Sequence, residues 1–176
     1  MDSGVEKTHR YRCPTPSRRP ALTPESHPDI ERLRFLLGTW RGNGQGDYPT
    51  IEGFAYEETV VFEHFGKPFV AYTQRTRGPD GPLHAEAGYI RPTQDGSLEL
   101  VIAQPTGVAE IYTGSQDKER LEFESAWIGL SPTAKQVNRV GRVIEVVDGC
   151  MRNELSMASV GQDFQWHLGA ELHRVG

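Results

Sequence analysis

Histidines are the residues of this 176-residue chain whose type could support metal chemistry, and there are six of them. His167 and His173 share the segment "QWHLGAELHR", but six residues of extended chain put them about 20 Å apart, too far to hold one ion together. No tight cluster of His, Asp and Glu appears elsewhere in the sequence, which argues against a bare zinc site. A lone histidine could still bind a metal ion whose other ligands come from outside the protein.

His167 stands at the head of the last extended segment. Leu168, Ala170 and Leu172 fall on one face of that strand, so strict alternation turns His167 to the opposite face. Either the regular strand begins after His167 or a β-bulge re-aims its ring, and the ring would then lie at the rim of the sheet. From the residues alone, a hydrogen-bonded histidine at a strand end is the plainer interpretation. Four other histidines are expected at the surface: His9, His27, His64 and His173.

The glycine-rich stretch "LLGTWRGNGQGDYPTIEGF", residues 36–54, is similar at first sight to a phosphate-binding loop. A dinucleotide site needs a helix that begins at the last glycine, whereas Pro49 follows these glycines at once. In the first strand of a barrel, glycines instead let the strand bend and let other backbone approach closely. The sequence also has no Gly-x-Ser-x-Gly elbow, Cys-x-x-Cys pair or Walker loop. We expect the strand carboxylates of Glu57, Glu58 and Glu86 to face solvent.

The elements that must position these residues are strands. From Trp40 onward, runs rich in Val, Ile, Thr and Tyr alternate with Gly, Pro and Asp turns, which predicts about ten strands. Short connections favour an antiparallel meander, and closure of the meander removes its exposed edges. The predicted fold is therefore all-β: a closed antiparallel barrel of about ten strands, of the lipocalin or fatty-acid-binding type. A short helix in "HPDIERLRFLLG" precedes it. Trp40 is expected to plug one end, and the interior is expected to hold a sizeable ligand.

Composition sets the remaining bounds. Residues 1–27 are rich in proline and charge, which predicts a disordered leader, and residues 28–176 form one predicted domain. A net charge of −5 argues against nucleic-acid binding, and no apolar run approaches the roughly 20 residues that cross a bilayer. The N-terminus lacks the apolar region of a signal peptide, and two cysteines give no disulfide framework. We expect a cytoplasmic protein, either monomer or homodimer.

An ordered series of short motifs makes the sequence similar to the nitrobindins, β-barrel proteins that bind ferric haem b. The first motif, "GTWRGNG" at residues 38–44, matches the family's Gly-x-Trp-x-Gly-x-Gly signature. The others follow in order: "YPT", "GKPFVAYTQ", "LHAEAGYIRP", "IAQPTG", "SPTAK" and "HLGAELHR". The resemblance covers roughly residues 33–174. Lipocalins and fatty-acid-binding proteins share a Gly-x-Trp opening, whereas the whole series is specific.

The resemblance implies that His167 is the proximal ligand of the haem iron. It implies further contacts at five positions: His84, Gln104 and Met157 in the pocket, and Thr50 and Lys135 at the haem edge. A lysine at that edge would give a haem propionate a charge-assisted hydrogen bond. Ordinary alternatives stay open for His84 as a hydrogen-bonded interior or rim residue, for Met157 as packing, and for Lys135 as a solvated turn residue.

The resemblance also implies an activity. It is the haem-dependent isomerisation of peroxynitrite to nitrate, together with reversible binding of nitric oxide. These two small molecules would be the partners, with no role for nucleic acid or membrane. Two other functions stay open: a non-catalytic sensor of nitric oxide or peroxynitrite, and a lipocalin-like carrier of an apolar small molecule. A carrier has no need of a histidine at position 167.

Overall fold

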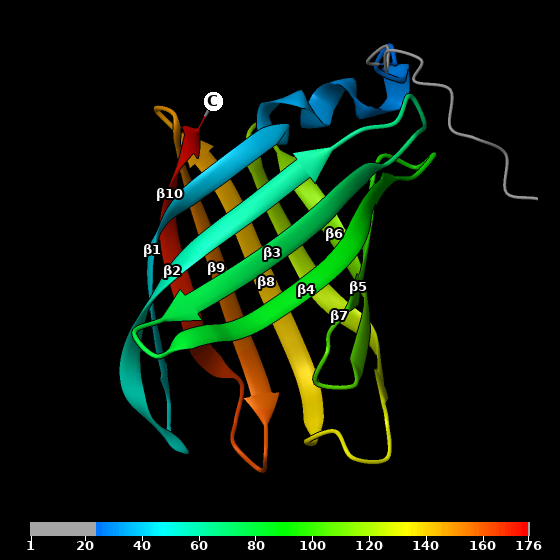
Figure 1. The fold of residues 1–176 in the computed structure, drawn as a ribbon. Helices are drawn as coiled ribbons and strands as arrows, with labels where there is room; N and C mark the ends of the chain where they lie inside the picture. Colours follow the sequence, from blue (N-terminus) through cyan, green and yellow to red (C-terminus); the bar gives the residue numbers. More distant parts are fainter. Residues whose placement is uncertain (1–23, 176) are drawn as a thin grey trace, which may run out of the picture.

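The structure, a computed structural model, describes residues 24–175 and shows a closed antiparallel barrel (Figure 1). Its strands follow one another around the ring in chain order, and β1 pairs with β10 to close it. The predicted barrel of about ten strands with a short preceding helix is confirmed. The predicted leader lies almost wholly outside the described residues. The elements are η1 (Pro28–Leu36), β1 (Gly38–Tyr48), β2 (Ile51–Glu63), β3 (Val70–Gly78), β4 (Gly81–Pro92), β5 (Leu98–Ala103), β6 (Val108–Asp117), β7 (Arg120–Leu130), β8 (Val137–Val147), β9 (Cys150–Ser159) and β10 (Gln165–Val175).

The helix η1 covers one end of the barrel, while the opposite end is formed by turns (Figure 1). It is a 3₁₀-helix, and its buried side chains Ile30, Leu33 and Leu36 recur every three residues, which matches three residues per turn. The Arg32 guanidinium fastens the helix by donating to two backbone carbonyls of the β4–β5 turn, each at 2.8 Å. Within residues 24–175, no helix is long and apolar enough to cross a membrane.

Trp40 closes one end of the barrel beneath η1, as the sequence predicted. Its side chain is completely buried, and its indole N–H donates to the carbonyl of Leu36 at 2.6 Å. The guanidinium of Arg174 lies over the indole, 4.5 Å from the ring centroid. This end of the interior is therefore filled by buried, mostly apolar side chains.

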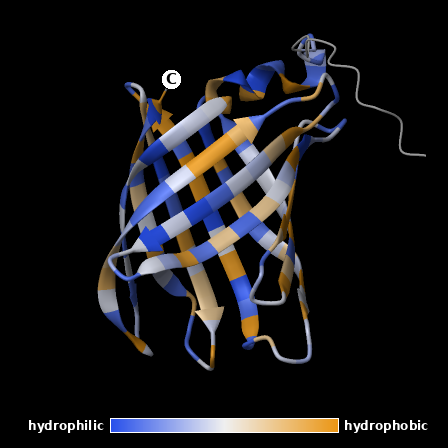
Figure 2. Cartoon of the chain, in the orientation of Figure 1, coloured by the Kyte–Doolittle hydropathy of each residue, from blue (hydrophilic) through white to orange (hydrophobic). Residues whose placement is uncertain are grey.

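Alternation along each strand decides what enters the barrel. In β2 the buried residues are Tyr56, Glu58, Val60 and Phe62, and the two apolar ones at the end of this run lie nearest η1. Hydrophobic and hydrophilic positions alternate along the strands throughout the barrel (Figure 2). The interior is thus layered, with an apolar end beneath the helix and a polar middle layer.

Gly42 shows why β1 carries glycines. A Cβ atom at this position would lie 1.9 Å from the backbone carbonyl oxygen of Glu171 on the paired strand β10. The expected close backbone approach is therefore present.

We expect Gly42→Ala to lower the free energy of unfolding by about 2–3 kcal/mol, because β1 or β10 must shift to admit the methyl group. Gly53→Ala is the matched control, since the nearest atom to its added Cβ would be 3.7 Å away. Its effect should stay within about 0.5 kcal/mol. Urea unfolding of both variants measures the difference, and equal losses would contradict this explanation.

Candidate functional site

A cavity of about 340 Å³ lies inside the barrel and is lined by the strand ends furthest from η1. Four residues that the resemblance assigned to the cofactor line it together: His84, Gln104, Met157 and His167. Thr50 and Lys135 do not line it. Both are exposed, Thr50 in the β1–β2 turn and Lys135 in the β7–β8 connection, at the same end of the barrel.

A β-bulge turns His167 toward the cavity. Trp166 pairs with Ser156 and Leu168 pairs with Leu155, so His167 is the additional residue between two regular pairs. His167 and Leu168 therefore both line the cavity although they are adjacent in sequence. Of the two geometries that the sequence allowed, the bulge is the one that the structure adopts.

The hydrogen bonding of His167 suits a metal ligand. Its Nδ1 lies 3.1 Å from the backbone carbonyl oxygen of Asp47 on β1, and because a carbonyl only accepts, Nδ1 carries the proton. This leaves the lone pair of Nε2 free, in the arrangement that metal-bound histidines use. Burial lowers the pKa of the half-buried imidazole, and this outweighs the opposing effect of the Asp47 contact. The lowered pKa favours the neutral ring, which is the form in which an imidazole can bind a metal ion.

Tyr48 packs against His167 and links two neighbouring parts of the barrel wall. Its ring meets the imidazole edge-on, with 5.1 Å between the ring centroids. Its hydroxyl accepts the backbone N–H of Ser159 at 2.9 Å, which ties β1 to the end of β9. These Asp47 and Tyr48 contacts could not be predicted from residue types, because they depend on how β1 and β10 meet in space.

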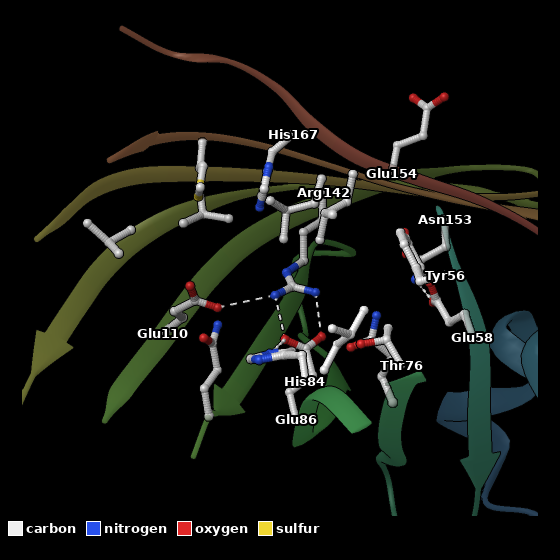
Figure 3. A pocket seen from close by; sticks show the side chains of 18 of the residues that line it. Tyr56, Glu58, Thr76, His84, Glu86, Glu110, Arg142, Asn153, Glu154 and His167 are labelled. Carbon is white, nitrogen blue, oxygen red and sulfur yellow. Dashed lines mark hydrogen bonds and ion pairs between the residues drawn. The ribbon is translucent and has the colours of Figure 1, made fainter. Parts of the chain in front are cut away.

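His84 and Gln104 face His167 from across the cavity. His84 lies on β4 and Gln104 directly follows β5, and in the closed ring these strands are nearly diametrically opposite β10. Figure 3 shows His167 and His84 on opposite walls, with Arg142 between them. A planar group bound through His167 would therefore turn its other face toward His84 and Gln104.

Buried charged side chains form the deeper part of the cavity wall. Arg142 donates to both oxygens of Glu86, at 2.6 and 2.8 Å (Figure 3). Its Nε donates to the hydroxyl of Tyr112 at 2.8 Å. Glu110 accepts from the Tyr112 hydroxyl at 2.6 Å and lies 3.4 Å from Arg142. A fifth side chain, Tyr72, donates to Glu86 at 2.6 Å. The expectation that Glu86 faces solvent is wrong.

Glu58 is a second correction. Its side chain is buried on the inner face of β2 and accepts a hydrogen bond of 2.6 Å from Asn153, whereas Glu57 is exposed as expected. Burial raises the pKa of Glu58 and outweighs its hydrogen bonds. Nearby, the buried Oε1 of Gln74 has no hydrogen-bond partner among residues 24–175. The middle layer of the barrel is therefore polar rather than a purely apolar cavity.

Comparison with known proteins identifies the relatives of this barrel. Residues 29–174 match the family model of the THAP4-like, heme-binding beta-barrel domain. A peroxynitrite isomerase of Nocardia farcinica is 49% identical over 154 residues, which cover 84% of this chain and 92% of that protein. A peroxynitrite isomerase of Arabidopsis thaliana is 42% identical and covers 89% of this chain and 95% of its own length. The crystal structure of Rv2717c from M. tuberculosis superposes with a TM-score of 0.80 at 45% identity, covering 86% of this chain and all of that one.

Proposed function

Because the chain belongs to the nitrobindin family of THAP4-like haem-binding β-barrels, we propose that it is a ferric haem b protein that isomerises peroxynitrite to nitrate. The observation that carries this proposal is the geometry of His167. Its ring is neutral, is oriented by the Asp47 carbonyl, and lines a cavity at the open end of a closed barrel. The names of the relatives supply the reaction.

The residues around the cavity fit a haem. His167 would hold the iron through Nε2, with the Asp47 carbonyl fixing the ring. A bound haem would supply a Lewis-acidic iron that can weaken the O–O bond of peroxynitrite. Thr50 and Lys135 lie at the exposed end, where the propionates would emerge, and the Lys135 ammonium would give a propionate a solvent-weakened ion pair.

The side opposite His167 would receive the small ligand. His84, Gln104 and Met157 border the cavity and would limit its size and its access to water. Nitric oxide would bind reversibly on the same side. A carrier of apolar molecules is disfavoured, because Glu58, Glu86 and Arg142 place charged or acidic groups in the interior.

Stopped-flow decay of peroxynitrite tests the activity. We expect the haem-loaded protein to accelerate decay to nitrate, and His167→Ala under the same haem concentration to return the rate to that of free haem. His173→Ala is the matched control, because His173 lies on the same strand with an exposed side chain. An unaltered rate constant in His167→Ala would refute the assignment.

A further inference from the structure

His84 lies against a buried carboxylate to which the proposed function gives no role. Its Nε2 is 3.7 Å from Oε2 of Glu86, longer than a hydrogen bond but close enough for the carboxylate to attract the ring N–H. The two side chains differ in exposure, at 28% for His84 and 2% for Glu86. His84 therefore sits at a boundary, with the cavity on one side and a buried charge on the other.

Glu86 is held in one place and in one charge state. Burial alone would raise the pKa of its carboxyl, but Arg142 and the surrounding hydrogen-bond donors outweigh burial and hold that pKa at about 2. Both carboxylate oxygens are bound by Arg142, which is itself fixed by Tyr112 and Glu110. A carboxylate fixed in this way can set the orientation and tautomer of an imidazole, as the aspartate of a catalytic triad does.

The orientation of the His84 ring is important because of where this residue lies in the cavity. It lies across the cavity from His167, on the wall that would face the open coordination position. The other ionisable side chains that line the cavity are Tyr56, Glu58, Glu110, Arg142, Glu154 and His167. Among them the carboxyls of Glu58 and Glu110 are engaged with Asn153 and with Tyr112, respectively.

We infer that the Glu86–Arg142 pair positions His84, with Nε2–H toward Glu86 and Nδ1 toward the cavity, so that Nδ1 exchanges a proton with the bound reactant. This inference rests on the proposed function. Peroxynitrite is the anion of a weak acid, and Nδ1 would take the proton of that acid as it enters, giving imidazolium and the anion. The anion rearranges to nitrate without gain or loss of atoms, and the proton then passes from Nδ1 to water. His84 is thus a catalytic residue, and Glu86 and Arg142 are positioning residues.

The first test uses haem-free protein, so it does not depend on activity. ¹⁵N NMR of protein labelled at histidine reports which ring nitrogen of a neutral imidazole carries the proton, and loss of signals in His84→Gln assigns this residue. We expect the Nε2–H form of His84 to dominate in the wild type. In Glu86→Leu the ratio of Nε2–H to Nδ1–H should fall about tenfold, because the electrostatic attraction between the buried carboxylate and the ring N–H is lost.

Glu110→Leu is the matched control, because it removes another buried carboxylate from the same Arg142 while Glu86 stays in place. Its tautomer ratio should equal that of the wild type. A ratio unchanged in Glu86→Leu, or changed equally in both variants, would overturn the positioning role. If Glu86→Leu does not fold, Glu86→Asp withdraws the carboxylate by one methylene and must lower the ratio.

The second test uses haem-loaded protein. His84→Gln should keep the absorption spectrum of bound haem and lower the rate of peroxynitrite decay by about a hundredfold, the usual contribution of a proton-exchanging side chain. A wild-type rate in this variant would overturn the proton exchange at Nδ1. If the loaded wild-type protein itself fails to accelerate decay, the proposed function fails, and the tautomer measurement still decides the positioning role.

Discussion

His167→Gly should lose the sharp Soret band of protein-bound haem at concentrations that saturate the wild-type protein. The His167 imidazole is the proposed ligand of the iron, and Nε2 would be its coordinating atom because Nδ1 contacts the Asp47 carbonyl. The loss in haem affinity should therefore exceed the roughly 10- to 100-fold that removal of an outer-sphere partner costs. Absorption titration with haemin measures it.

Two further measurements test whether the loss of haem binding is specific to the His167 imidazole. Free imidazole should restore haem binding to His167→Gly, because the vacated space beside the Asp47 carbonyl can receive the small ring. His173→Gly should bind haem as the wild type does, since its side chain is exposed near the far end of β10. Equal haem affinity in His167→Gly and wild type would contradict the assignment of the ligand.

Arg142→Leu should lower the free energy of unfolding at pH 7 by about 3–5 kcal/mol, because it leaves the buried carboxylates of Glu86 and Glu110 without their cation. Arg139→Leu is the control on the same strand. Arg139 pairs with Glu124 at 2.6 Å, but both side chains are exposed. Arg139→Leu should therefore change the free energy of unfolding by little more than the error of the measurement. Urea unfolding of the haem-free proteins compares them.

The loss of unfolding free energy in Arg142→Leu should also depend on pH. The pKa of Glu86 falls from 4.5 to about 2 on folding, so the stabilisation it brings is present above pH 4.5 and is lost as the pH falls toward 2. In Arg142→Leu, burial without the cation reverses the shift of that pKa. The difference in unfolding free energy between the wild type and Arg142→Leu should therefore become smaller as the pH is lowered from 7 to 3. A constant difference would show that Arg142 acts through packing alone.

The fold was predictable from sequence because its determinants are local. Turn residues and two-residue alternation mark each strand, and short connections leave little choice but an antiparallel meander. Gly42 could also be interpreted correctly, because a glycine in a first barrel strand indicates close backbone approach. The helix before β1 was predicted, but its 3₁₀ geometry was not, because burial of Ile30, Leu33 and Leu36 against the barrel selects it.

The site was only partly predictable, because it depends on contacts between distant segments. The alternation of Leu168, Ala170 and Leu172 indicated either a bulge at His167 or a regular strand that begins only after it, but the pairing with β9 decided between them. The Asp47 carbonyl that orients His167 lies 120 residues away in sequence. Such a backbone contact has no signature in residue type.

The buried charges were missed although the sequence held a signal. Glu58 has the same alternation phase as Val60 and Phe62, which predicts an inward side chain. The solvent-facing expectation followed residue type, since unpaired carboxylates are rarely buried. For Glu86 the pairing cation, Arg142, lies four strands away around the barrel. The ion pair that offsets burial of the carboxylate could therefore be recognised only in the folded, closed barrel.

Resonance Raman spectroscopy of the reduced, haem-loaded protein would show whether His167 holds the haem iron from the β10 wall. We expect an iron–imidazole stretching band that shifts on ¹⁵N labelling of histidine, disappears in His167→Gly and persists in His84→Gln. A band that persists in His167→Gly and disappears in His84→Gln would contradict this assignment, because the iron would then be held from the opposite wall.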